Sequence, residues 1–124
     1  MRNWWACLAA FCVGPLGVGF CDEEPIRVLT YNVRYANRGD GEDRWENRRE
    51  TVLATVAGSD LVGLQEVLAS QQDDIERATE GWQWAAVGRD DGLRRGEMVP
   101  VGWRAQALSA VEQGAFWLSE HPER

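Results

Sequence analysis

A strand pattern, a helix pattern and a second strand pattern follow one another in the first half of this chain, and this order limits the folds open to it. Residues 26–32 combine β-branched and aromatic residues with partial alternation, which is typical of a strand. From Arg44 to Val56 apolar residues recur at helical spacing, and Gly58 follows as a usual helix stop. Residues 61–64 form a short apolar run that suits a buried strand.

The second half of the chain continues with one helix and several strands. Ser70 is a suitable helix cap, and we expect a helix over residues 70–79. Strands are predicted over residues 82–87, 98–103 and 106–112, with Gly-rich loops at 36–43 and 88–96. The order predicts an α+β or α/β fold with helices covering one face of a sheet.

Length and charge restrict the class of protein. The chain has 124 residues, which corresponds to one domain at most. It carries 13 basic and 20 acidic residues, a formal net charge of −7. An acidic surface does not gain affinity for nucleic acid by counterion release, which argues against a dedicated DNA-binding protein. A bound divalent cation would offset the charge locally, so phosphate chemistry stays open.

The N-terminus has the pattern of a secretory signal. Arg2 supplies the positive end, residues 4–13 form an uncharged apolar run, and Gly17 and Gly19 offer small residues at both positions that a signal peptidase reads. We expect a signal peptide over residues 1–19, a polar lead-in over 20–25 and a secreted or periplasmic protein. The apolar run is too short and interrupted to predict a membrane span. The alternatives are a membrane anchor, a buried hydrophobic strand, or a lipoprotein attached through a cysteine.

That lipid attachment would use Cys12 or Cys21. Each is preceded by phenylalanine where a small residue is preferred, so we favour export without a lipid. If cleavage follows Gly19, Cys21 remains as the single cysteine and no intrachain disulfide can form.

Two polar residues stand at the ends of predicted strands and carry the candidate chemistry. Asn32 follows the first strand, and Glu66 follows the second. A carboxylate held at the end of a buried strand suits Mg²⁺ or Mn²⁺, which prefer oxygen ligands. Each residue also has an ordinary explanation, because asparagine is common in turns and Glu66 could cap the next helix.

The order of these motifs resembles the endonuclease/exonuclease/phosphatase superfamily, the DNase I-like phosphoesterases. The similarity is carried by residues 26–34, 45–49 and 60–67. Residues 87–92, 96–97 and 116–120 are similar to a secreted bacterial branch of that family. The resemblance covers nearly all of the chain after the signal.

The resemblance implies a four-layer α/β sandwich and a metal-dependent phosphoester hydrolase. By this resemblance Glu66 would be a ligand of Mg²⁺ (or Mn²⁺), and Asn32 would help to hold the metal or the scissile phosphate. Both would then be catalytic. Weaker expectations for contact with a phosphoester substrate are Arg34, Arg89, Glu97 and Trp117, and Arg48 could also meet an anionic substrate.

The chain departs from the family in its histidines. The family uses histidines in Asn-x-His and Ser-Asp-His motifs, together with a Gly-Asp-x-Asn motif, and none of these is present. The only histidine, His121, corresponds to a loop position. Complete sandwiches run to ~200–250 residues, so we expect the first sheet and its helices only. One face of that sheet would be open to a C-terminal half or to self-association, and we expect four tryptophans to line it: Trp82, Trp84, Trp103 and Trp117.

Three functions therefore remain open from the sequence. The first is the N-terminal part of a Mg²⁺-dependent phosphoesterase, which need not be active by itself. The second is a non-catalytic binding or interaction module built on the same half-fold. The third and weakest is a tryptophan-rich binder of carbohydrate.

Overall fold

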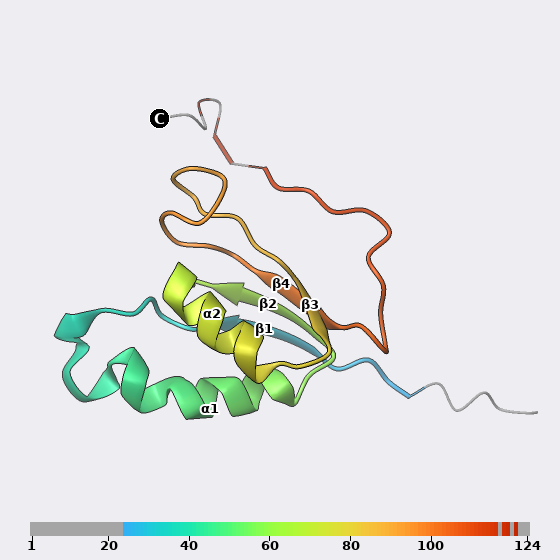
Figure 1. Ribbon diagram of the computed structural model, residues 1–124, viewed down its shortest axis with the longest axis horizontal. Helices are drawn as coiled ribbons and strands as arrows, with labels where there is room; N and C mark the ends of the chain where they lie inside the picture. The colour runs from blue at the N-terminus through green and yellow to red at the C-terminus, as the bar shows by residue number, and fades with distance from the viewer. Residues whose placement is uncertain (1–23, 117, 120, 122–124) are drawn as a thin grey trace, which may run out of the picture.

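The computed structural model describes residues 24–116, 118–119 and 121, and it confirms an α+β fold. The predicted signal peptide at 1–19 lies outside the described residues. A mixed four-stranded sheet and two α-helices form the body of the protein (Figure 1). The elements, in chain order, are β1 (Val28–Asn32), the 3-10 helix η1 (Arg38–Asp43), α1 (Trp45–Ala57), β2 (Leu61–Gln65), α2 (Ala69–Ala78), β3 (Trp82–Ala85) and β4 (Val101–Arg104).

The sheet has the strand order β1-β2-β4-β3. Strands β1 and β2 are parallel, with Asn32 opposite Gln65, and the other two neighbouring pairs are antiparallel. A parallel pair needs a crossover between its strands, and α1 supplies it. Both parallel strands therefore finish at the same edge of the sheet, and this brings the residues after Asn32 and after Gln65 together.

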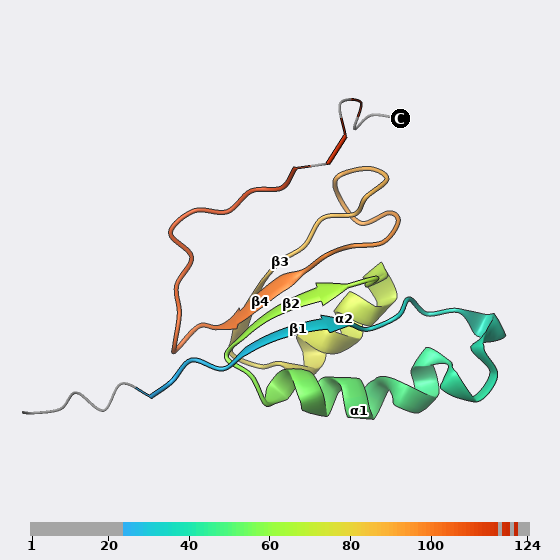
Figure 2. The ribbon, with the colours of Figure 1, turned by 180° about the vertical axis from the view of Figure 1, so that it is seen from behind.

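Both helices pack on one face of the sheet and enclose the core. Figure 1 shows α2 in front of the strands, and Figure 2 shows the strands in front of α2. Helix α1 contributes Trp45, Val52 and Val56 to the core, as the helical spacing predicts. The indole Nε1 of Trp45 also donates to Asp74 Oδ2 of α2 over 2.8 Å, which joins the two helices. The other buried core residues are Val33, Val62, Leu64, Val67, Ile75 and Met98.

Helix α2 begins one residue earlier than its sequence indicates. Its first residue is Ala69 and its cap position is Leu68, so the prediction that Ser70 caps the helix is wrong. The side chain of Gln71 accepts a hydrogen bond from the Leu68 N–H over 3.1 Å. The N-terminus is therefore stabilised by the third residue of the helix reaching back, which is the glutamine half of a capping box.

Two of the tryptophans predicted for the open face lie on the helix-covered face instead. A Cβ added at Gly102 would stand 2.4 Å from the ring of Trp84, so these residues share a face. Trp84 also donates from Nε1 to Thr79 Oγ1, just after α2, and stacks on Trp82 at 5.7 Å. The open face is reached by the residues that alternate with Gly102. Trp103 is one of them, but its side chain is buried, at 8% exposed. Trp117 lies outside the described residues.

The later strands are shorter than predicted, because some of the residues expected in them pair only as isolated bridges. Met98 pairs with Val67 and Gly88 as isolated bridges, so the predicted strand over 98–103 becomes β4 only from Val101. No strand forms at 106–112, where the chain turns and then continues irregularly. In the described part of the chain, no helix has the length and apolarity needed to cross a membrane.

Candidate active site at the ends of β1 and β2

The two residues predicted to carry the chemistry meet at the carboxyl ends of the parallel strands. Asn32 is the last residue of β1, and Glu66 directly follows β2. Asn32 Nδ2 donates to Glu66 Oε1 over 2.8 Å, although 34 residues separate them in the sequence. The carboxyl ends of parallel strands are where α/β sheets place their ligand sites.

Both ends of the Asn32 amide are fixed by their partners. Its Oδ1 accepts the Arg34 N–H over 2.8 Å, while its Nδ2 faces the carboxylate. The reverse orientation would set a carbonyl oxygen against a carboxylate oxygen and an amino group against an N–H. The Tyr35 N–H donates to the other oxygen, Glu66 Oε2, over 3.3 Å. In this arrangement Asn32 orients Glu66.

These contacts favour the ionised form of Glu66. The hydrogen bond from Asn32 is the largest cause that lowers the pKa of its carboxyl, followed by the Tyr35 N–H and the positive charge of Arg34. Partial burial acts in the opposite direction and is outweighed. Glu66 is consequently a carboxylate at neutral pH, as a metal ligand must be.

The backbone is strained at Glu66 itself and at Arg34, which follows Asn32 by two residues. Arg34 has a φ of 54° and Glu66 a φ of 57°, and these are the only non-glycine residues with positive φ in the described chain. Side chains avoid this left-handed region because Cβ crowds the following carbonyl oxygen. Such residues persist only where the surroundings hold them, and they gather at functional sites.

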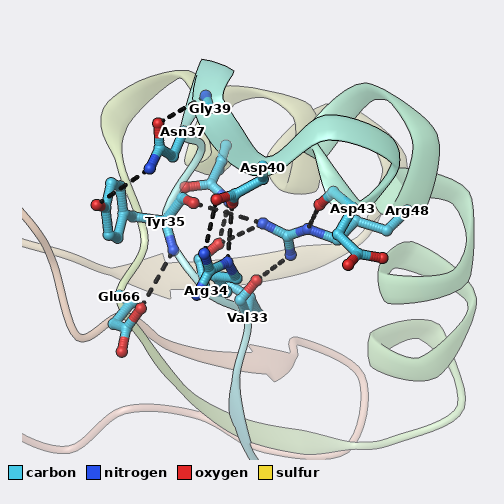
Figure 3. Close-up of polar contacts among 10 residues, drawn as sticks. Val33, Arg34, Tyr35, Asn37, Gly39, Asp40, Asp43, Arg48 and Glu66 are labelled. Atoms are coloured by element: carbon cyan, nitrogen blue, oxygen red, sulfur yellow. Dashed lines mark hydrogen bonds and ion pairs between the residues drawn. The ribbon is translucent and has the colours of Figure 1, made fainter.

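An open pocket of about 660 Å³ adjoins Asn32 and is lined by both acidic and basic groups. Arg34 lies in its wall and pairs with Asp40 of η1 through two hydrogen bonds, Nε to Oδ2 at 2.8 Å and Nη2 to Oδ1 at 2.6 Å. Arg34 remains largely exposed while the Asp40 side chain is 5% exposed. The pair lowers the pKa of Asp40 and fixes the direction of the guanidinium (Figure 3).

Arg48 also lines this pocket, but its guanidinium is engaged with the main chain. Its guanidinium donates to the carbonyl oxygens of Val33, Arg34 (2.6 Å) and Asp43 (2.8 Å), as Figure 3 shows. It also lies 5.3 Å from the ring of Trp45. Arg48 therefore braces the loop after β1, which is a different arrangement from the predicted contact with an anionic substrate.

Gln71 is a site residue that the sequence did not single out. It is fully buried, and its side-chain amide bonds to the two loops that carry Asn32 and Glu66. The available signal was its place three residues after a helix start, where glutamine commonly reaches back to the preceding backbone. The misplacement of that start at Ser70 concealed it.

The remaining weaker candidates lie in the second half of the chain. Arg89 and Glu97, in the loop between β3 and β4, form an ion pair at 3.5 Å, and Glu97 is next to Met98, which bridges to Val67. They border the site and are not joined to Asn32 or Glu66 by the hydrogen bonds that hold that pair. Trp117 lies outside the described residues.

His121 lies in a loop, as expected. Its N–H donates to Ser119 Oγ over 3.0 Å.

The oxygen donors present fit a lightly ligated metal ion. Among the described residues, no three or more Asp, Glu, His or Cys side chains are grouped so that they could hold a metal ion. Mg²⁺ differs from transition metals because it is commonly held by one or two carboxylates, with waters and substrate phosphate completing its shell. Each oxygen of Glu66 accepts a hydrogen bond, from Asn32 or from Tyr35, and has a second lone pair, so the carboxylate can still bind an ion.

Comparison with known proteins gives the chain its relatives. No protein-family model and no curated protein matches the sequence. Solved structures do match. An endonuclease/exonuclease/phosphatase from Bacteroides vulgatus is 34% identical with a TM-score of 0.74, covering 78% of this chain and 38% of that one. A Bacteroides thetaiotaomicron mannosyl-6-phosphatase is 36% identical with a TM-score of 0.74, covering 80% and 39%.

A third structure, an endonuclease/exonuclease/phosphatase family protein from Bacteroides thetaiotaomicron, agrees with these two. It is 36% identical with a TM-score of 0.72, covering 77% of this chain and 35% of that one. The chain thus spans less than two fifths of the length of the relatives it matches. By fold and by sequence, this chain belongs to the endonuclease/exonuclease/phosphatase family.

Proposed function

We propose that this chain carries the first half of the site of a metal-dependent phosphoester hydrolase. The observation that supports the proposal is the 2.8 Å hydrogen bond between Asn32 and Glu66 at the ends of two parallel strands. It fixes an ionised carboxylate at the edge of a sheet, beside a pocket with an arginine in its wall. The structural relatives include a mannosyl-6-phosphatase, so sugar phosphates belong first in a substrate panel.

Each residue then has a distinct task. Glu66 would bind Mg²⁺ or Mn²⁺, and Asn32 and the Tyr35 N–H would hold the carboxylate toward the ion. The bound ion would stabilise negative charge on the phosphoryl oxygens. Arg34, directed by Asp40, would contact a phosphate oxygen from the pocket side.

The Asn-x-His and Ser-Asp-His motifs, which supply the family's acid–base groups, are absent from this sequence. The main-chain N–H of its single histidine, His121, donates to Ser119. We therefore propose that the acid–base groups belong to sequence that this chain does not contain, and that the chain alone binds metal but hydrolyses phosphoesters poorly. The alternative of an interaction module would keep the fold without any metal response.

Metal binding by the full chain tests the proposal directly. Mn²⁺ should broaden the amide resonances of residues 32–36 and 66–67 selectively, because paramagnetic relaxation falls steeply with distance. Glu66→Gln should abolish this local broadening, since an amide is a poor substitute for a carboxylate ligand. Glu97→Gln is the matched control, because Glu97 is also a half-buried glutamate beside the site.

Two results would contradict parts of the proposal. Broadening that is equal in the wild type and in Glu66→Gln would remove Glu66 as the metal ligand. Rapid Mg²⁺-dependent turnover of p-nitrophenyl phosphate or mannose 6-phosphate, lost in Glu66→Gln, would support the hydrolase but overturn the half-site.

A further inference from the structure

The loops after β1 and β2 are joined by one buried side chain that touches neither of the proposed ligand groups. Gln71 Oε1 accepts from the Ala36 N–H at 3.0 Å and from the Leu68 N–H at 3.1 Å. Gln71 Nε2 donates to the Arg34 carbonyl oxygen at 3.0 Å. The side-chain amide of Gln71 therefore bonds to two donors and one acceptor. Two of these three groups, the Ala36 N–H and the Arg34 carbonyl, belong to the loop that follows Asn32.

Arg48, on α1, holds the same loop through its carbonyl oxygens. Its guanidinium donates to the carbonyl oxygens of Val33 and Arg34, and a longer contact of 3.5 Å reaches that of Tyr35. The Arg34 carbonyl thus receives hydrogen bonds from both Gln71 and Arg48. Figure 3 shows Arg48 directed at this stretch from the side of η1 and α1.

The strained part of the backbone belongs to the stretch that these two side chains hold. Arg34 has a positive φ, and the next residue, Tyr35, presents its N–H to Glu66 Oε2. A left-handed arginine relaxes unless the flanking peptide groups are held, and relaxation would turn the Tyr35 N–H away from the carboxylate. The partners of the Arg34 and Ala36 peptide groups therefore decide whether Glu66 keeps its second hydrogen bond.

We infer that Gln71 and Arg48 are positioning residues, which clamp the main chain of residues 33–36 so that the Tyr35 N–H and Asn32 hold Glu66 in place. The inference concerns the metal site of the proposed function and rests on it for its consequence, but the clamp itself is a property of the described contacts. Outer contacts of this kind orient ligands, and their loss commonly lowers metal affinity by about 10–100-fold.

The neighbouring glutamine offers a matched control. Gln72 is as buried as Gln71 and lies on the same helix, but its Nε2 donates to Glu76 and its Oε1 has no partner. Gln71→Glu and Gln72→Glu place the same carboxylate in the same buried helix turn. Only Gln71→Glu removes the hydrogen bond to the Arg34 carbonyl and sets a carboxylate oxygen against it.

The test measures hydrogen exchange of the Tyr35 amide and Mn²⁺ affinity in the full chain. Gln71→Glu should lower the protection of the Tyr35 amide at least about tenfold and weaken Mn²⁺ binding by about 10–100-fold, whereas Gln72→Glu should change neither. Unchanged protection in Gln71→Glu, or an equal loss in both variants, would overturn the inference, since the effect would then belong to the helix as a whole.

Arg48→Lys keeps the test decisive if Gln71→Glu does not fold. Lysine retains the charge but cannot span several carbonyl oxygens with a planar fork, so Tyr35 protection should fall again. Arg49→Lys, on the next position of α1, is its control. If Mn²⁺ affinity does not depend on Glu66, the proposed function fails, and Tyr35 exchange still decides whether the clamp exists.

Discussion

The side-chain amide of Asn32 donates to the carboxylate of Glu66 across the parallel strands β1 and β2, at 2.8 Å. This contact turns two strand-end residues into one unit. Together with the Tyr35 N–H, which donates to Oε2, it gives each carboxylate oxygen of Glu66 a donor and lowers the pKa of this carboxyl.

Removing the side-chain amide of Asn32 should raise the pKa of Glu66. Asn32→Ala is expected to raise the pKa of Glu66 toward the ordinary glutamate value of about 4.3, because the largest favourable contact of the ionised form is lost. A ¹³C NMR titration of the Glu66 carboxyl measures it. Thr30→Ala, on the same strand, is the control, and an unchanged Glu66 pKa in Asn32→Ala would show that the contact does not stabilise the carboxylate.

Acid should weaken the fold partly through Asp60. Its carboxylate accepts from the Arg27 main chain and guanidinium, and Arg104 lies 3.3 Å away, so its pKa is far below the usual range. A group with a depressed folded pKa stabilises the protein above its unfolded pKa of about 3.9 and loses that contribution as pH falls further.

The measurement is urea unfolding between pH 7 and pH 2. Asp60→Asn should lower stability at pH 7 and flatten the decline below about pH 4. Glu50→Gln, at an exposed site on α1, should leave the pH profile of the wild type intact. A decline just as steep in Asp60→Asn would assign the acid sensitivity to other carboxylates.

Gly102 should not tolerate a side chain. A Cβ there would stand 2.4–2.6 Å from three atoms of the Trp84 ring, so Gly102→Ala forces β4 or the ring to move. We expect a loss of about 1–3 kcal/mol in the free energy of unfolding, the usual cost of overpacking.

Gly63→Ala is the contrasting variant, because Gly63 belongs to the adjacent strand and a methyl group added there would meet no atom within 4 Å. Its unfolding free energy should stay close to that of the wild type. Equal losses in both variants would mean that glycine flexibility, and not the Trp84 contact, sets the cost.

Arg34 should provide a modest part of any phosphate affinity. Arg34→Gln is expected to weaken binding of inorganic phosphate by up to about fivefold in the presence of Mg²⁺, because exposed charge contacts contribute ~0.2–1 kcal/mol. Isothermal titration measures this, with Arg38→Gln in η1 as the control for net charge. A comparable loss in Arg38→Gln would indicate a nonspecific charge effect.

The sequence by itself determined the order of the elements and the two ligand candidates. Helical spacing around Val52 and the apolar run of β2 are local signals, and they were sufficient to predict α1 and both parallel strands. The short motifs around Asn32 and Glu66 identified the family, which the structural relatives confirm.

Only the tertiary structure decided how those residues are held. The faces of Trp82 and Trp84 depend on strand register, in which a shift of one residue reverses every side chain, and the sequence does not fix that register. The capping position of Gln71 could have been found from the sequence, but its contacts and those of Arg48 to the loop after β1 go to main-chain groups, which carry no residue type and leave no pattern. The parallel pairing of β1 and β2 finally brings Asn32 and Glu66 within hydrogen-bond distance, because it ends both strands at one edge of the sheet.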